Sequence, residues 1–129
     1  MTLIDTSAWI EFFRKQGNRD IKLRVAEFID IEDAAYCGPV SFEVMTGARK
    51  SEMPIINQAF EFSTLLEFPH ECWLASAEIE KELRKQGITV PRDDIFVAAA
   101  ALHHNVPLYA DDRHFEMNRD TATNALMLV

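Results

Sequence analysis

The sequence predicts an α/β domain in which a central, mainly parallel sheet of four to five strands is flanked by helices on both sides. Two observations predict this class. Short apolar stretches alternate with longer segments of helical periodicity, and acidic residues directly follow two of the apolar stretches. The 129 residues are enough for one hydrophobic core and contain no linker, repeat or low-complexity segment. We therefore expect a single domain, residues 1–129.

The expected strands are short apolar stretches that end at polar, Gly or Pro residues. They cover residues 2–4, 34–37, 65–68, 105–110 and 125–129. Asp5 directly follows the first strand, and Gly38 follows the second. In an open parallel sheet the carboxyl ends of the strands meet at one edge, where loops and helix N-termini leave a crevice for ligands. Asp5 is therefore expected at the ligand-binding edge.

The segments between the strands carry apolar residues at helical spacing. The expected helices cover the residues from Ser7 to Gly17, then 20–30, 40–49, 53–66, 71–86, 92–104 and 113–119. Ser7 is the expected N-cap of the first helix, because its hydroxyl can accept a hydrogen bond from a free backbone N–H. The residues of 71–86 expected to face the core are Leu74, Ala75, Ala77, Ile79 and Leu83. The helix at 92–104 is apolar almost all round, which predicts that it is buried.

The composition is acidic, with 21 Asp and Glu against 13 Lys and Arg and a net charge of −8. This balance argues against a broad basic surface for nucleic acid, although acids that bind divalent cations would present the opposite charge to a substrate. Cys37 and Cys72 have no metal-binding spacing, so we expect reduced thiols and no zinc site. There is no apolar leader and no apolar run of membrane-spanning length, so we expect a soluble cytoplasmic protein and no membrane partner.

Four acidic positions are candidates for one site. Asp5 follows the first expected strand, and Asp111 and Asp112 follow the fourth. Asp94 opens the expected buried helix, where an unpaired carboxylate would be costly. Glu43 is flanked by apolar residues and is compatible equally with a site and with the exposed side of an amphipathic helix.

Converging carboxylates repel one another, and a hard divalent cation such as Mg²⁺ or Mn²⁺ is the usual compensation. Such a site suits the hydrolysis of phosphodiesters, because the metal lowers the pKa of a bound water and positions the phosphate. The chain contains no Ser/His/Asp triad, Gly-rich phosphate loop or dinucleotide fingerprint. A phospho-acceptor module or an Asp-x-Asp phosphatase is also disfavoured, because Ser7 stands where the second acid would be needed and no lysine follows Lys85.

Four short motifs occur in order along the chain. They are Asp5-Thr6-Ser7, Glu43-Val44-Met45-Thr46-Gly47, Asp94-Ile95-Phe96-Val97-Ala98-Ala99 and Asp112-Arg113-His114-Phe115. This ordered set resembles the motifs of PIN-domain ribonucleases, and in particular the VapC-type toxins of bacterial and archaeal toxin–antitoxin pairs. The resemblance spans nearly the whole chain.

The resemblance implies a PIN-like three-layer fold and a Mg²⁺- or Mn²⁺-dependent endoribonuclease that cuts structured RNA, such as a transfer RNA. It implies a homodimer and a VapB-type antitoxin whose tail occupies the acidic groove. Asp5, Glu43, Asp94 and Asp112 match the catalytic, metal-binding acids, and Ser7 matches a hydroxyl residue that supports the site. The alternative is a catalytically inactive PIN-like domain that binds metal or protein; the presence of all four acids argues against it.

Two departures from the family pattern leave alternatives open. Ala110 stands where the family often has Thr or Ser, and Asp93 and Asp111 adjoin the matched acids, so either could replace its neighbour. Asp94 is preferred over Asp93 because the apolar run that follows fits the family spacing from it. The expected phosphate contacts are Arg14, Lys15 and Arg113. Trp9, Phe12 and Phe13 are expected to form core or dimer contacts rather than to stack on bases.

Overall fold

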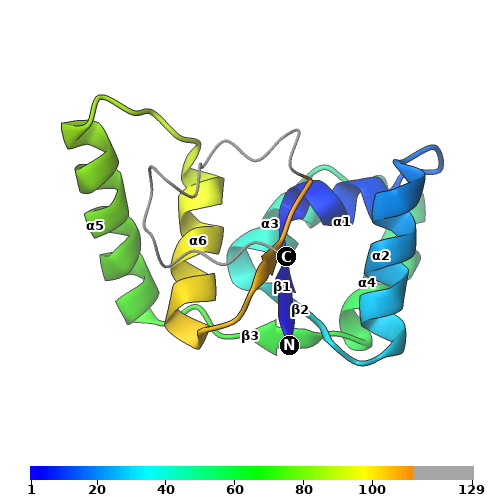
Figure 1. The fold of residues 1–129 in the computed structure, drawn as a ribbon. Coiled ribbons are helices and arrows are strands. Elements are labelled where there is room, and N and C mark those ends of the chain that lie inside the picture. Colours follow the sequence, from blue (N-terminus) through cyan, green and yellow to red (C-terminus); the bar gives the residue numbers. More distant parts are fainter. Residues whose placement is uncertain (112–129) are drawn as a thin grey trace.

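The computed structural model describes residues 1–111, which form a four-stranded parallel sheet flanked by helices (Figure 1). The strands are β1 (Thr2–Ile4), β2 (Ala34–Cys37), β3 (Thr64–Leu66) and β4 (Leu108–Tyr109), in the order β3-β2-β1-β4. Each neighbouring pair runs in parallel. The expected fold class is confirmed. The expected helix 113–119 and strand 125–129 lie outside the described residues.

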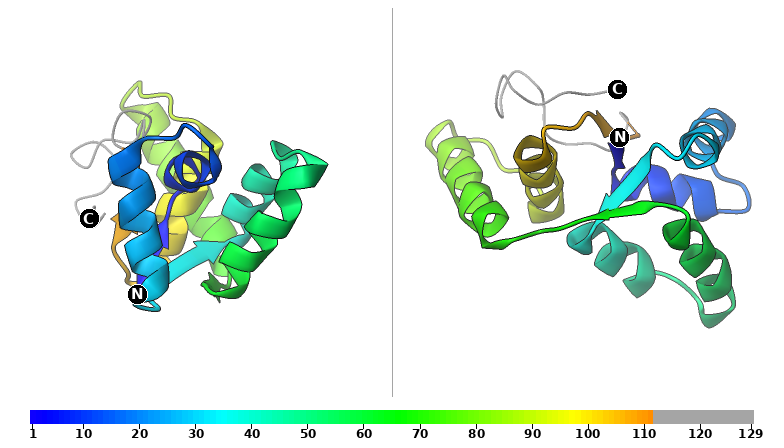
Figure 2. Two further views of the ribbon diagram at one scale, coloured as in Figure 1. Left: turned by 90° about the vertical axis from the view of Figure 1, so that its right-hand side faces the viewer. Right: turned by 90° about the horizontal axis from the view of Figure 1, so that it is seen from below.

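The helices of this part of the chain fall into two groups. They are α1 (Thr6–Phe13), α2 (Arg19–Asp30), α3 (Gly38–Thr46), the short 3-10 helix η1 (Lys50–Glu52), α4 (Met53–Glu61), α5 (His70–Lys85) and α6 (Arg92–His104). Helix α5 packs against α6 at one end of the molecule, and α1, α2 and α4 lie at the other (Figure 1). The right-hand view of Figure 2 shows β3 running between the two groups. None of the described helices has both the length and the apolar character that crossing a membrane requires.

Strand β1 is the centre of the sheet and its residues are buried. Leu3 lies opposite Ala35 of β2 on one side and Leu108 of β4 on the other. Because the three strands are parallel and in this register, the residues that follow them reach the same edge of the sheet. Asp5 follows β1 there, and Asp111 follows β4.

Helix α6 and the aromatic residues of α1 account for much of the core. The prediction that 92–104 is a buried helix is confirmed: its buried residues are Ile95, Val97, Ala98, Ala99, Ala100 and Ala101. Trp9 is fully buried, with its ring stacked on Phe13 at 5.7 Å and edge-on to Phe60 at 5.1 Å between ring centroids. The core role expected for Trp9 is therefore confirmed, and its rigid packing fixes the helix that carries Ser7.

The structure corrects the expected first helix. The N-cap of α1 is Asp5 and not Ser7: the Asp5 carboxylate accepts a hydrogen bond from the backbone N–H of Ser7 at 3.1 Å. Both residue types are good caps, and the extended backbone of Asp5 decides between them.

The prediction of which residues of α5 face the core was also wrong in part. Leu74 is 57% exposed and Ala77 is exposed, whereas the buried positions of the helix are Cys72, Ser76, Ile79 and Leu83. These four positions follow the helical period and share one face. Helix α5 has more apolar residues than its buried face has positions. Trp73 and Leu74 lie off that face and remain on the surface.

A buried acid holds the corner between α1 and α2. The Glu11 carboxylate, in a residue only 7% exposed, accepts hydrogen bonds from the Asn18 backbone N–H and from the Arg14 guanidinium, both at 3.0 Å. A Cβ atom on Gly17 would lie 1.8 Å from the Glu11 carbonyl oxygen. The corner therefore has room only for glycine at this position.

Candidate active site

Asp5 lies at the carboxyl edge of the sheet with 3% of its surface exposed, the same fraction as Asp111. Its Oδ2 atom accepts hydrogen bonds from the Ser7 hydroxyl at 2.6 Å and from the Ser7 backbone N–H at 3.1 Å. Burial raises the pKa of the Asp5 carboxyl above its ordinary value, and the bonds from Ser7 oppose that rise. The carboxylate is thus fixed in direction while remaining poorly solvated.

Ser7 links two strands at this edge. While its hydroxyl donates to Asp5, its oxygen accepts a hydrogen bond from the Asp111 backbone N–H at 3.0 Å. The end of β4 is in this way fastened to the start of α1. Ser7 therefore orients Asp5 and also ties the position of Asp111 to it.

Glu43 reaches the same edge from α3, which starts immediately after β2. The side chain is half-buried and lies among other acids. Burial, as the larger cause, and the neighbouring charge of Asp93 together raise the pKa of the Glu43 carboxyl to about 7. The Thr6 hydroxyl lies close enough to lower this pKa slightly, but it is buried and has no hydrogen bond of good geometry among residues 1–111.

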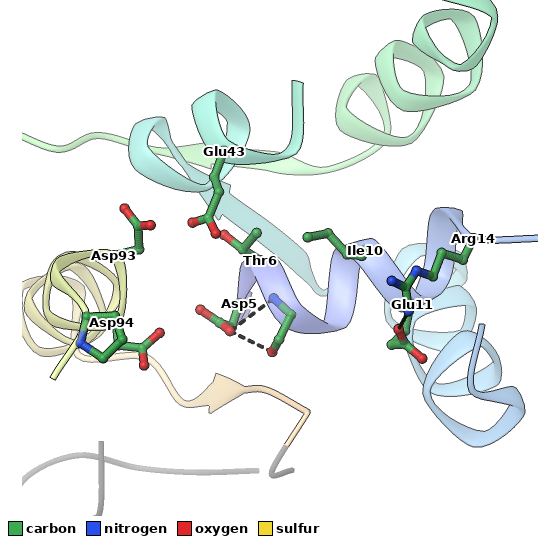
Figure 3. Close-up of a pocket in the computed structure, with 10 residues that line it drawn as sticks. Asp5, Thr6, Ile10, Glu11, Arg14, Glu43, Asp93 and Asp94 are labelled. Atoms are coloured by element: carbon green, nitrogen blue, oxygen red, sulfur yellow. Dashed lines mark hydrogen bonds and ion pairs between the residues drawn. The ribbon is translucent and has the colours of Figure 1, made fainter. Parts of the chain in front are cut away.

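The first turn of α6 supplies two more acids, Asp93 and Asp94. In Figure 3 the Asp93 carboxylate points toward Glu43, whereas Asp94 extends toward Asp5. All four side chains line one cavity of about 390 Å³. The cavity combines one acid after β1, one from the helix after β2 and two from α6, and Glu11 of α1 also lines it.

The predicted site residues can now be located. Asp5, Glu43, Asp94 and Ser7 line this cavity, as does Arg14, whose guanidinium is paired with Glu11. Lys15 lines a groove next to the cavity. Asp112 and Arg113 lie outside the described residues.

Several residues of the cavity were not predicted as site residues, and two of them, Asp93 and Thr6, lie beside Glu43. Asp93 was considered only as a replacement for Asp94, although the structure places both acids at the cavity. Thr6 was read only as part of a motif, and its buried hydroxyl had no signal in the sequence that could single it out. For Asp93 the signal was present: two successive acids in the first turn of a buried helix.

The donor chemistry of the cavity fits a hard divalent cation. Within residues 1–111 no three Asp, Glu, His or Cys side chains converge closely enough to hold a metal ion by themselves. Mg²⁺ does not need such a cage, since it commonly binds through one or two carboxylates and keeps several waters. The cavity supplies oxygen donors, and a bound cation would relieve the repulsion between Glu43 and Asp93.

The acidic cavity lies at the carboxyl edge of a parallel α/β sheet, which is where such folds bind their ligands. The PIN domain family profile matches residues 2–119. The chain belongs to the PIN domain family, which confirms the resemblance seen in the four motifs.

Curated relatives agree with this assignment over most of the chain. Ribonuclease VapC11 of Mycobacterium tuberculosis is 29% identical over 133 residues, covering 91% of this chain and 90% of that protein. Ribonuclease VapC1 of Methanocaldococcus jannaschii is 27% identical over 115 residues, covering 88% of this chain and 78% of that protein. Each similarity covers most of this chain and more than three quarters of the relative.

Solved structures show the same fold at low sequence identity. VapBC2 from Rickettsia felis, bound to a DNA fragment from its promoter, has a TM-score of 0.80 and 15% identity, covering 99% of this chain and 96% of that chain. DNA-bound VapBC from Salmonella typhimurium has a TM-score of 0.80 and 14% identity, with the same coverage. The PIN-like three-layer fold is confirmed by these likenesses.

Proposed function

We propose that this protein is a Mg²⁺- or Mn²⁺-dependent endoribonuclease and the toxin of a VapBC-type toxin–antitoxin pair. The observation that carries the proposal is the cavity in which Asp5, Glu43 and Asp94 come together from three separate segments. The proposal is supported by membership of the PIN domain family and by the similarity to relatives named as ribonucleases.

The acids have distinct tasks in this proposal. Asp5, Glu43 and Asp94 hold the divalent cation, and Asp112 joins them on the strength of its motif. The bound ion would supply an activated water and a counter-charge for the phosphate. Ser7 keeps Asp5 pointed into the cavity through its two hydrogen bonds, so that little reorganisation is needed when the ion and substrate bind.

Structured RNA, such as a transfer RNA, is the proposed substrate. The Arg14 side chain is 66% exposed and borders the acidic cavity, and Lys15 lies beside it. The pairing of one Arg14 nitrogen with Glu11 fixes the guanidinium and leaves its other donors for phosphate oxygens. We propose that Arg14, Lys15 and, from its motif, Arg113 contact the RNA backbone on either side of the cut.

A VapB-type antitoxin is the proposed regulatory partner. A groove of about 460 Å³ adjoins the acidic cavity and shares Ile10, Arg14 and Glu43 with it. Apolar side chains such as Phe13 line it, and so do the basic residues Arg14 and Lys15. An apolar segment with acidic residues would complement this groove. The likeness of fold to VapBC2 from Rickettsia felis and VapBC-1 from nontypeable Haemophilus influenzae supports this partner.

A homodimer is the proposed assembly. Phe42 is 72% exposed and Trp73 is 49% exposed, and both line an apolar depression together with Phe68 and Phe96. A patch of this kind on a folded domain is typical of a protein interface. The depression also reaches Asp93, so a second copy docked there would lie next to the acidic cavity.

Substitution of Asp94 by Asn tests the proposed activity. It removes a charge while keeping the shape, and we expect RNA cleavage with Mg²⁺ to fall by more than about 100-fold, since loss of even an outer partner of a metal ligand costs about 10–100-fold. Growth inhibition in cells should be lost in parallel. Asp20→Asn, at an exposed first-turn position of α2, is the control and should cleave like the parent.

Asp94→Asn and Asp20→Asn both remove an acid from the first turn of a helix. The control therefore shows whether a loss of cleavage comes from a weakened helix rather than from a lost metal ligand. Equal cleavage by the parent and Asp94→Asn would contradict the proposal. A parent protein that binds the antitoxin but cuts no RNA with either metal would instead favour a catalytically inactive PIN-like domain.

A further inference from the structure

The first turn of α6 carries a basic residue directly before the two acids of the cavity. In the run 91–94, Pro91, Asp93 and Asp94 line the acidic cavity, whereas Arg92 is not among its lining residues. Arg92 instead lines two smaller pockets together with Glu80 of α5. Helices α5 and α6 pack side by side (Figure 1). The basic residue of this turn therefore lies on the side of α6 that faces α5.

Glu80 holds Arg92 on that side through two hydrogen bonds. Arg92 Nε donates to Glu80 Oε1 at 3.0 Å, and Arg92 Nη2 donates to Glu80 Oε2 at 3.4 Å. A carboxylate that accepts two bonds from one guanidinium fixes its direction as well as its distance. Arg84, one turn further along α5, donates to the same carboxylate at 2.9 Å. The hydrogen bonds from Arg92 lower the pKa of the Glu80 carboxyl, so this acid stays ionised.

The position of this ion pair matters more than its strength. Both arginines of the pair of contacts are exposed, and exposed ion pairs contribute little to folding stability. Arg92, however, is the immediate neighbour of Asp93 along the chain. A positive charge that is free to turn toward the acids would be attracted to them and would repel a divalent cation bound there.

We propose that Glu80 is a positioning residue for the acidic cavity, which holds Arg92 on the α5 side of α6 and so leaves the acids of the first turn available to a divalent cation. The inference rests on the proposed metal-dependent function and adds a residue that lies outside the four motifs. Without Glu80, Arg92 acts as an internal counter-ion that competes with the metal. Glu80 thus acts through Arg92 and needs no contact with the metal or with RNA.

A competing explanation is that the ion pair only fastens α6 to α5. The N-cap of α6 is Pro91, whose side chain makes no capping hydrogen bond, so the start of this helix would benefit from such a fastening. The two explanations differ in what the removal of Arg92 does. A fastening is lost when either partner is removed, and it is not recovered when both are. A restrained cation ceases to matter once the cation itself is gone.

The test is a calorimetric titration of the full chain with Mn²⁺ in the absence of RNA. We expect Glu80→Ala to weaken binding by roughly three- to tenfold, because the charge of Arg92 acts through partly screened electrostatics. The double variant Glu80→Ala/Arg92→Ala should regain the parent affinity, and Arg92→Ala alone should bind at least as tightly as the parent. The difference between Glu80→Ala and the parent should shrink at about 1 M salt, where the Debye length is about 3 Å.

Glu78→Ala is the matched control. It removes an acid of the same helix that is also paired with a basic residue, Lys81, and it should bind Mn²⁺ like the parent. Urea unfolding of each variant checks that the fold is kept.

The outcomes separate this inference from the proposed function. A double variant that binds Mn²⁺ as weakly as Glu80→Ala overturns the inference, because the acid then does not act by restraining Arg92. Equal affinity of Glu80→Ala and the parent overturns it, and so does an equal loss in Glu78→Ala. In each of these cases a parent that binds Mn²⁺ leaves the metal-dependent nuclease standing. A parent that binds no Mn²⁺ and cuts no RNA contradicts the proposed function itself, and the inference fails with it.

Discussion

Replacement of Glu43 by Gln offers the sharpest physical test of the acidic cavity. In the folded, metal-free protein, burial and the charge of Asp93 raise the pKa of Glu43 from 4.5 to about 7. The unfolded chain has no such crowding, so below about pH 4.5 the carboxyl is protonated in both states, and above about pH 7 it is ionised in both. Ionised Glu43 therefore destabilises the folded protein, and this penalty grows as the pH rises between those two values.

The size of the effect follows from the pKa difference. An interval from 4.5 to about 7 corresponds to at most about 3 kcal/mol. Glu43 is only half-buried, so solvent screening reduces the expected penalty to roughly 1–2 kcal/mol. Gln is neutral at every pH and nearly the same shape. Glu43→Gln should therefore raise the free energy of unfolding by roughly 1–2 kcal/mol at about pH 8 and change it little at about pH 4.

Urea unfolding followed by circular dichroism, with a chelator present, measures this difference. Glu67→Gln, at an exposed position before α5, is the control and should change stability by less than about 0.5 kcal/mol. Added Mg²⁺ should stabilise the parent more than Glu43→Gln, because only the parent keeps the full set of acids. The reasoning is refuted if Glu43→Gln is no more stable than the parent at about pH 8.

Two further substitutions test the supports of the cavity. Gly17→Ala places a Cβ atom 1.8 Å from the Glu11 carbonyl oxygen and should destabilise the protein by about 1–3 kcal/mol in urea unfolding. Gly38→Ala is the control, because a Cβ atom at Gly38 would have no neighbour within 4 Å. A similar loss of stability in both variants would contradict the crowding argument for Gly17. Ser7→Ala removes the 2.6 Å bond to Asp5 and should lower Mg²⁺ affinity by about 10–100-fold in calorimetry. An unchanged affinity would mean that Ser7 does not orient the acid.

Much of the fold could be predicted because each layer has its own pattern in the sequence. The strand 2–4 and the helix 92–104 are apolar enough that only burial explains them, and the structure places both in the core. The predictions failed where two residues could take the same structural role at a similar local free energy. Asp5 and Ser7 are both good caps, and the outward turn of Leu74 depends on how α5 meets α6, which no local pattern records.

The site was predictable in its main acids but not in its full donor set. Asp5 could be placed because a carboxylate right after a buried strand can lie only at the sheet edge. The directions of Asp93 and Asp94 could not be predicted, since consecutive helical residues differ by about 100° and either can face the cavity. Thr6 could not be found either, because a hydroxyl shows its lack of a partner only once its neighbours are known.

The bond between the Asp111 N–H and the Ser7 hydroxyl spans 104 positions of the chain. A ribosome makes the N-terminal half first, so Asp5 and Glu43 emerge well before α6 and β4 exist to meet them. The long-range pairing of β4 with β1 is also the kind of contact that forms late in folding. The acidic cavity therefore cannot be completed before α6 has been made, and a nascent chain that stops short of α6 carries Asp5 and Glu43 without an assembled site.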